Sequence, residues 1–245
     1  MFDMIKEVFG YLGRPGSDVR AIVFTGEGKH FTAGLDLTSA AEMQGLRAGG
    51  DEKDPARAGF DFFQVVGPLQ ESVTSLEKVR VPVIAAINGL CIGAGVDLCS
   101  AADIRIASKG SKFTIKEVDI GLAADIGTLQ RFQKVVGNDS WTRELAYTAR
   151  FFSAEEALDR GFLSKVSETP AQCLEDAIKM ATFIASKSPV AVAATKMSLI
   201  FSRDHSVQQG LDHVATINSA MLQTDDLGTA AAAMMTKQKA VFPKL

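Results

Sequence analysis

CIGAGVDLCSAADIRIASKGSKFTIKEVDIGLAADIGTLQR, residues 91–131, combines glycines, apolar runs and isolated carboxylates in one part of the chain. Three of its acids, Asp97, Glu117 and Asp125, each stand beside apolar residues. Carboxylates in such surroundings are expected to be partly desolvated, which raises the pKa and suits proton transfer near neutral pH. A second interpretation stays open for each acid taken alone, because a carboxylate can also pair with a lysine or cap a helix.

Outward from this stretch, length and composition describe a globular chain. Its 245 residues suffice to bury a sizeable core, and we favour one domain with a helical appendage. Hydrophobic residues make up 47% and charged residues 22%, and no uninterrupted apolar run reaches the roughly 18 residues of a membrane span. The net charge of −3 and the pI of about 5.7 argue against a nucleic-acid-binding surface. We therefore expect neither nucleic acid as a partner nor a membrane span.

The cysteines and histidines do not form a recognisable metal or disulfide pattern. The cysteines are odd in number, without a C-x-x-C pair, and the histidines stand singly without the spacing of metal ligands (Cys91, Cys99, Cys173; His30, His205, His213). We assign no metal, and we expect a reducing compartment.

A targeting signal is recognisable at the C-terminal end of this sequence and not at its N-terminal end. The first sixteen residues have neither the apolar core of a signal peptide nor the composition of a transit peptide. The C-terminal Pro243-Lys244-Leu245 is similar to the Ser-Lys-Leu address of peroxisomal proteins. We therefore expect a peroxisome or a related organelle, with the mitochondrion as the alternative.

Strand and helix signals alternate along the first two thirds of the chain, and helical signals fill the rest. Apolar runs of strand length predict strands at residues 19–25, 81–87, 103–107, 112–115 and 162–166. Apolar periodicity and capping patterns predict helices at residues 1–12, 60–77, from 93–95 onward, 126–136, 138–149, 153–161, and from 170 to the end. Asp97 lies in the first turns of the helix that begins at 93–95, and Asp125 is a candidate cap of the helix at 126–136. This order predicts an α/β core with a C-terminal helical extension.

Two glycine-containing segments, Ala33-Gly34-Leu35 and Gly93-Ala94-Gly95, adjoin predicted strands. Neither matches a nucleotide-binding loop, because Leu98 stands where the third glycine of G-x-G-x-x-G is required and no Walker spacing occurs. One backbone N–H from each segment could converge on a single carbonyl oxygen, and each donor of such an oxyanion hole contributes about 3 kcal/mol to enolate stabilisation. The other interpretation, that both segments are simple tight turns, stays open.

An oxyanion hole next to carboxylates favours one reaction class. A thioester or ketone held by two N–H donors has an acidified α-hydrogen, which a carboxylate within hydrogen-bond reach can remove. The chain has no G-x-S-x-G motif, and its histidines offer no recognisable Ser-His or Cys-His pair. The residues therefore predict proton abstraction next to a carbonyl group.

Three motifs in sequence order carry a family resemblance: F-T-A-G-L-D-L at residues 31–37, A-A-I-N-G-L-C-I-G-A-G-V-D-L at 85–98 and K-E-V-D-I-G-L-A-A-D-I-G-T-L-Q-R at 116–131. They resemble the enoyl-CoA hydratase/isomerase (crotonase) superfamily, and within it the Δ3,5-Δ2,4-dienoyl-CoA isomerases are the most similar. The resemblance implies a crotonase-like ββα spiral core over residues 1–168 and a C-terminal helical trimerisation region over residues 169–245. It also leads us to expect that the N-terminal strand pair of the family is missing from this sequence.

The resemblance assigns a role to each candidate residue. The N–H groups of Leu35 and Ala94 would bind the thioester oxygen of an acyl-CoA, with Ala33 and Gly34 in the same substrate-binding segment. Glu117 would remove the C2 proton of a 3,5-dienoyl-CoA, Asp125 would protonate C6, and Asp97 would orient or bias the pair; the roles of Glu117 and Asp125 can be exchanged. The product would be a 2,4-dienoyl-CoA, as in the β-oxidation of unsaturated fatty acids.

The resemblance also implies the partners. The substrate would be an acyl-CoA, no cofactor beyond the coenzyme A of that substrate is expected, and the assembly would be a homotrimer or homohexamer. Two alternatives are an enoyl-CoA hydratase, in which Asp97 and Glu117 would hold a water molecule, and a non-catalytic or RNA-binding family member. Asp125 speaks against the first, because hydratases of the family have glycine there, and the net negative charge speaks against the second.

Overall fold

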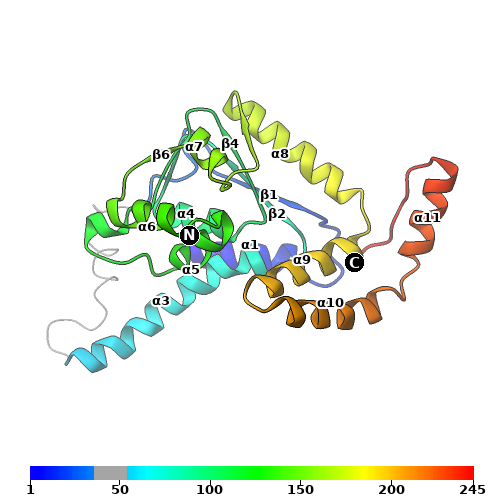
Figure 1. The fold of residues 1–245 in the computed structure, drawn as a ribbon, viewed down its shortest axis with the longest axis horizontal. Coiled ribbons are helices and arrows are strands. Elements are labelled where there is room, and N and C mark those ends of the chain that lie inside the picture. The colour runs from blue at the N-terminus through cyan, green and yellow to red at the C-terminus, as the bar shows by residue number, and fades with distance from the viewer. Residues whose placement is uncertain (36–53) are drawn as a thin grey trace.

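The computed structural model describes residues 1–35 and 54–245, and in it helices surround two β-sheets (Figure 1). The last two residues of the first motif, Asp36 and Leu37, lie outside the described residues. None of the described helices is both long enough and apolar enough to cross a membrane. The expected α/β architecture is confirmed.

A four-stranded parallel sheet forms the centre of the molecule. Its strand order is β1 (Ile22–Thr25), β2 (Val83–Ile87), β4 (Ile104–Ser108) and β7 (Lys165–Ser167). All five residues of β2 are buried, which explains why its sequence is a continuous apolar run rather than an alternating one.

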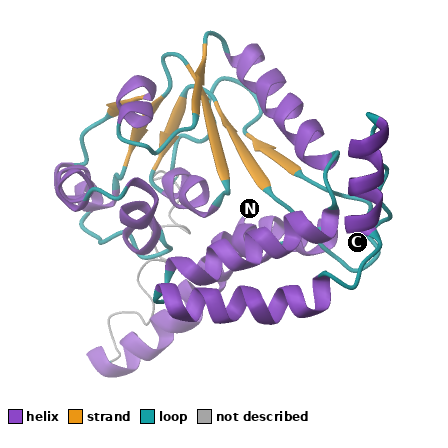
Figure 2. Cartoon of the chain, turned by 45° about the vertical axis from the view of Figure 1, so that its right-hand side comes forward, coloured by secondary structure: helices purple, strands orange, loops and turns teal. Residues whose placement is uncertain are grey.

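Both faces of this sheet are covered (Figure 2). On one face, Ile84 and Ile106 pack against Cys173 and Ala177 of α8 (Pro170–Ala185). On the other face, alternate residues of β2 such as Ala85 belong to the main core beneath α3 (Pro55–Lys78) and α4 (Ala94–Ala101).

A smaller second sheet consists of β3 (Leu90–Ile92), β5 (Lys112–Thr114) and β6 (Phe152–Ser153). β3 runs parallel to β5, and β6 pairs antiparallel with β5. The sequence did not predict β3 or β6. β3 has only three residues and lies between Gly89 and Gly93, so it is too short to show the periodicity of a strand.

Apart from the short η1, which the sequence did not predict, the remaining helices agree with the predicted order, although several begin or end at other residues. They are α1 (Phe2–Leu12), the 3₁₀ helix η1 (Glu117–Ile120), α5 (Thr128–Val136), α6 (Asp139–Thr148), α7 (Ala154–Asp159), α9 (Pro189–Arg203), α10 (Val207–Met221) and α11 (Asp226–Thr236). Asn138 and Ser153 cap α6 and α7 through their side chains, as their sequence context predicts.

The C-terminal third is not helical to its end. α11 stops at Thr236, and Lys237 adopts a left-handed conformation that ends the helix. The segment that follows is held on the core, because Phe242 is buried and Arg20 donates to the carbonyl oxygens of Phe242 and Pro243 at 2.6 and 3.1 Å. α9, α10 and α11 lie together at one end of the molecule, away from α4 and α6 (Figure 1). The division at residues 168–169 stays a prediction, and α8 packs on the sheet of the core.

Candidate active site

The segments that carry Leu35 and Ala94 are joined by a parallel bridge. Thr32 forms a parallel bridge with Cys91 of β3: its N–H donates to Leu90 O at 3.0 Å, and its carbonyl accepts from Ile92 N at 3.3 Å. Leu35 and Ala94 each lie three residues beyond this bridge, and beyond it Gly34 still approaches Ile92, and Gly95 approaches Thr32. The two predicted donor segments therefore emerge side by side at the same edge.

Glycines make the sharp turn at this edge feasible. Gly93 has φ 55° and ψ −117°, and its N–H donates to Thr114 O at 3.0 Å, at the end of β5. Ala94 is the first residue of α4, so the helix does not use its N–H, and the positive end of the helix faces the same space. Gly34 has φ 90°, and a Cβ there would lie 3.0 Å from Ile92 Cγ2.

Asp97 lies in the first turn of α4 and is completely buried. Its Oδ1 accepts a hydrogen bond from the backbone N–H of Thr128, whereas its Oδ2 has no hydrogen-bond partner among the described residues. Burial raises the pKa of Asp97 to about 6, although the N–H of Thr128 and the charge of Arg131 oppose this increase. Asp97 is therefore held in one orientation with one oxygen available.

Glu117 begins η1, three residues after β5. Its Oε1 would lie 3.2 Å from a Cβ at Gly93, so this carboxylate approaches the turn that precedes Ala94. Its Oε2 is buried and has no hydrogen-bond partner in the described part of the chain. Burial, and then the charge of Asp97, raises the pKa of Glu117 to about 7. A carboxyl group with this pKa can both accept and release a proton near neutral pH.

Asp125 lies in the segment that leads into α5 and is partly buried, and burial raises its pKa. The prediction that it caps α5 is wrong: the cap position is Gly127, and the first N–H of the helix, that of Thr128, is taken by Asp97. The carbonyl oxygen of Asp125 accepts from Gln70 Nε2 at 2.7 Å. The residue borders a polar cavity of about 320 Å³ between α3, α5 and the end of α9.

The three acids act on one another electrostatically. The charges of Asp97 and Asp125 raise the pKa of Glu117, and that of Asp125 raises the pKa of Asp97. Three carboxylates from different elements therefore share one region, and their mutual repulsion favours states in which at least one carries a proton.

The structure adds residues to the site that the sequence did not identify. Thr128 holds Asp97, Gln70 holds the backbone at Asp125, and the charge of Arg131 reaches Asp97. Each of these residues lies on a different element from the acid on which it acts, so no local sequence pattern indicates its role. In the described residues, no cluster of three or more His, Cys, Asp or Glu side chains is arranged to hold a metal ion.

Comparison with known proteins identifies the family. The sequence profile described as enoyl-CoA hydratase/isomerase matches residues 2–244. The chain therefore belongs to the enoyl-CoA hydratase/isomerase family.

Particular relatives are more specific than the family. The chain is 49% identical over 222 residues to the mitochondrial Δ3,5-Δ2,4-dienoyl-CoA isomerase of Mus musculus, an alignment that covers 91% of this chain and 67% of the mouse protein. It is 46% identical over 228 residues to the peroxisomal Δ3,5-Δ2,4-dienoyl-CoA isomerase of Arabidopsis thaliana, covering 93% of this chain and 81% of that protein. Among solved structures, an enoyl-CoA hydratase from Bacillus anthracis superposes with a TM-score of 0.84 at 26% identity, covering 98% of this chain and 87% of that one.

Proposed function

We propose that this protein is an enzyme that converts 3,5-dienoyl-CoA into 2,4-dienoyl-CoA. The observation that carries the proposal is the third acid, Asp125, which stands in the electrostatic range of the Asp97–Glu117 pair at the edge that presents Leu35 and Ala94. Two relatives with this activity in their names, at 49% and 46% identity, support it.

The proposed reaction is a proton removal and a proton delivery at the two ends of a conjugated system. The N–H groups of Leu35 and Ala94 bind the thioester oxygen, and Glu117 takes a proton from C2. The electrons of the broken C–H bond form a dienolate whose negative charge the two donors stabilise. Asp125 then protonates C6, so that the double bonds at C3 and C5 become double bonds at C2 and C4, and the proton on Glu117 returns to Asp125 before the next turnover.

Asp97 has an electrostatic role in this scheme. Its negative charge, buried next to Glu117, raises the proton affinity of that base, and the hydrogen bond from Thr128 fixes its position. The reverse assignment, with Asp125 as the base and Glu117 as the acid, uses the same geometry. Coenzyme A enters as part of the substrate, and the scheme needs no further cofactor.

Assembly and location belong to the same proposal. We expect a homotrimer or homohexamer, which is supported by the exposed apolar side chains of α9, α10 and α11 and by a cavity of about 700 Å³ between these helices. The relatives are named mitochondrial in mouse and peroxisomal in Arabidopsis, and we propose one of these two compartments for this protein.

The test is to incubate the purified protein with 3,5-octadienoyl-CoA and to follow the absorbance of the 2,4-dienoyl product, with 2-enoyl-CoA hydration measured in parallel. Isomerisation without hydration supports the proposal, whereas hydration alone would favour a hydratase in which Asp125 takes no part.

Glu117→Gln and Asp125→Asn should each lower kcat by about 10²- to 10⁴-fold, because each removes one proton-transfer group. Asp119→Asn is the matched control, since Asp119 lies on η1 but pairs with Lys116 at the surface. Wild-type turnover in both variants would refute the scheme.

A further inference from the structure

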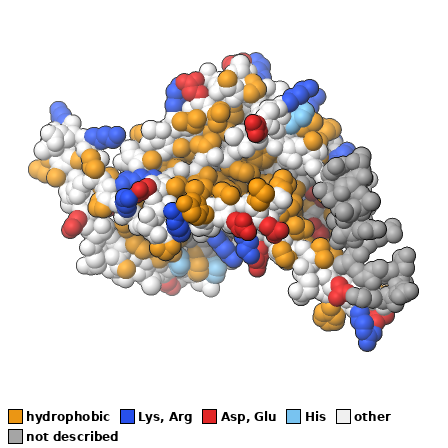
Figure 3. Space-filling model, turned by 180° about the vertical axis from the view of Figure 1, so that it is seen from behind, with side chains coloured by type: hydrophobic (Ala, Val, Ile, Leu, Met, Phe, Trp, Pro, Cys, Tyr) orange, Lys and Arg blue, Asp and Glu red, His pale blue; other side chains and the backbone are white. Residues whose placement is uncertain are grey.

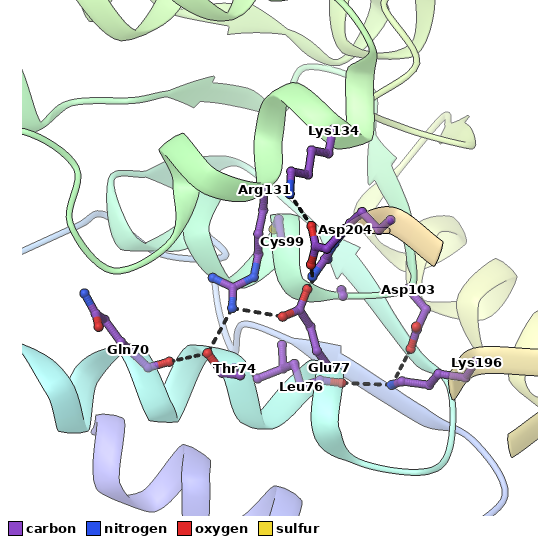
Figure 4. A network of polar contacts seen from close by, with 12 residues as sticks. Gln70, Thr74, Leu76, Glu77, Cys99, Asp103, Arg131, Lys134, Lys196 and Asp204 are labelled. Atoms are coloured by element: carbon purple, nitrogen blue, oxygen red, sulfur yellow. Dashed lines mark hydrogen bonds and ion pairs between the residues drawn. The ribbon is translucent and has the colours of Figure 1, made fainter. Parts of the chain in front are cut away.

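One face of α3 binds Arg131 through Thr74 and Glu77 (Figure 4), and the same face contacts the segment that carries Asp125. Gln70 donates to the carbonyl of Asp125 at 2.7 Å. One and two turns further along the helix, Thr74 Oγ1 and Glu77 Oε2 each lie 2.9 Å from Arg131 Nη2. Side chains four and three residues apart share a helix face, so these three contacts form one continuous surface against residues 125–131.

Arg131 is the central residue of this surface. Its side chain is 11% exposed and that of its partner Glu77 is 8% exposed, so the ion pair is shielded from solvent. A Cβ on Gly127 would lie 1.9 Å from Arg131 Nη1, and Gly127 has φ 140°. The guanidinium therefore packs directly on the backbone of Gly127, and the next residue is Thr128, whose N–H binds Asp97.

The groups around Asp97 are otherwise acidic or neutral. Glu117 comes from η1 and Asp125 from the segment before α5, and the buried thiols of Cys91 and Cys99 come from β3 and α4. On α3, Glu77 is neutralised by Arg131 and by Arg203 of α9. On α5, Lys134 is engaged with Asp204. Arg131 is the cation that lowers the pKa of Asp97 against the effect of burial.

We propose that Arg131 is a positioning residue for the isomerisation: it fixes the Asp125–Thr128 turn against α3 and places its positive charge on the backbone of Gly127, next to the N–H of Thr128 that binds Asp97. This inference rests on the proposed function. The charge stabilises the state in which Asp97 and Glu117 are both ionised, which is the state in which Glu117 can accept the C2 proton. Loss of the charge should therefore raise the pH at which this pair releases its second proton.

The experiment compares the pH dependence of kcat/KM for 3,5-octadienoyl-CoA in the wild type, Arg131→Met, Arg131→Lys and Arg203→Met. The acidic limb of this pH profile is the part in which kcat/KM rises with pH. In Arg131→Met this limb should move to higher pH by about one unit. Arg131→Lys keeps the positive charge but loses the planar guanidinium group with its several N–H donors. The acidic limb of this variant should therefore stay in place while kcat falls. Arg203→Met is the matched control, because it removes the other cation on Glu77 and should leave the limb in place.

A uniform decrease of kcat/KM in Arg131→Met with an unmoved limb would overturn the inference and leave Arg131 a purely structural role. If the Met variant does not fold, Arg131→Lys still tests the inference, because a displaced limb in that variant would contradict it.

A second measurement separates this inference from the proposed function. Carboxyl ¹³C NMR titration of Asp97 and Glu117 in substrate-free protein needs no turnover. Absence of isomerisation in the wild type would refute the proposed function, whereas the titration would still report on Arg131. Carboxyl titrations that are the same in Arg131→Met and the wild type would overturn the role of its charge.

Discussion

Asp97 combines its proposed electrostatic role with a cost in stability. Burial of an ionisable group in a low-dielectric interior disfavours its charged form, and here the pKa of Asp97 is about 6 instead of its ordinary value of 3.8. The folded state therefore binds this proton more tightly than the unfolded state. The stability that follows is fully present below about pH 4 and is lost as the pH rises through about 6.

Asp97→Asn should consequently be more stable than the wild type at pH 8, where the wild type carries a buried charge. The amide oxygen can still accept from Thr128, so the difference in unfolding free energy should increase in favour of the variant between pH 4 and pH 8, by up to about 3 kcal/mol. Urea denaturation at several pH values measures it. Asp176→Asn is a control in which the stability difference between variant and wild type should change with pH in the opposite direction, because Lys165 and Ser167 lower the pKa of Asp176 to about 2. A pH-independent difference at Asp97 would contradict this account.

The pH–rate profile is the second expectation at this scale. In the proposed scheme Glu117 must be ionised to accept the C2 proton, and its pKa is raised to about 7, chiefly by burial. Activity should therefore rise with pH through about 7 instead of through the ordinary glutamate value near 4.5. Measurement of kcat/KM between pH 5 and pH 8 tests this, and a flat profile over that range would show that Glu117 titrates elsewhere or is not the base.

At the scale of elements, the junction of β3 with α4 controls the geometry of the site. Gly93 joins them with φ 55° and ψ −117°, a conformation that an L-residue strains to adopt, and its α-carbon faces Glu117. The turn thus sets both the direction of the Ala94 N–H and the approach of the Glu117 carboxylate.

Gly93→Ala should therefore reduce both stability and turnover. We expect a loss of about 1–3 kcal/mol in unfolding free energy from backbone strain, and a decrease in kcat because the new Cβ lies 3.2 Å from Glu117 Oε1. Gly161→Ala is the matched control, since Gly161 has φ 79° but open space around it. That control should lose stability and keep its kcat. Equal kcat in both variants would contradict the role of the turn.

At the scale of the whole molecule, apolar side chains remain accessible on several faces. Figure 3 shows such side chains across the middle of one face, with acidic and basic ones interspersed. The C-terminal helices expose large apolar groups, among them Leu211 at 55% and Met235 at 86%. Such groups gain stability when a second copy of the chain covers them.

We expect a particle of three or six chains of 26.1 kDa in light scattering coupled to size-exclusion chromatography. The double variant Leu211→Asp/Met235→Asp should shift the particle toward the monomer, because burial of two carboxylates in an interface is unfavourable. Val8→Asp, an exposed position on α1, is the control and should keep the wild-type mass. A monomeric wild type at micromolar concentration would refute the assembly.

Local signals in the sequence were sufficient for much of the fold. The continuous apolar run of β2 indicates a strand buried on both faces, and the caps Asn138 and Ser153 mark the starts of α6 and α7, because these effects operate within a few residues. β3 was missed because three residues between two glycines carry no periodicity. Asp125 was misjudged as a cap because the competing acceptor, Asp97, lies on another helix.

The sequence by itself determined the family, the α/β class and the candidate residues Asp97, Glu117, Asp125, Leu35 and Ala94, since motif, spacing and apolar context are all properties of short segments. Only the tertiary structure decided how these residues meet. The Thr32–Cys91 bridge joins the segment of Leu35 to that of Ala94, burial sets the pKa values of the acids, and α3 brings Glu77 to Arg131. Register, desolvation and contacts between distant elements depend on how the whole chain packs, and no short segment encodes them.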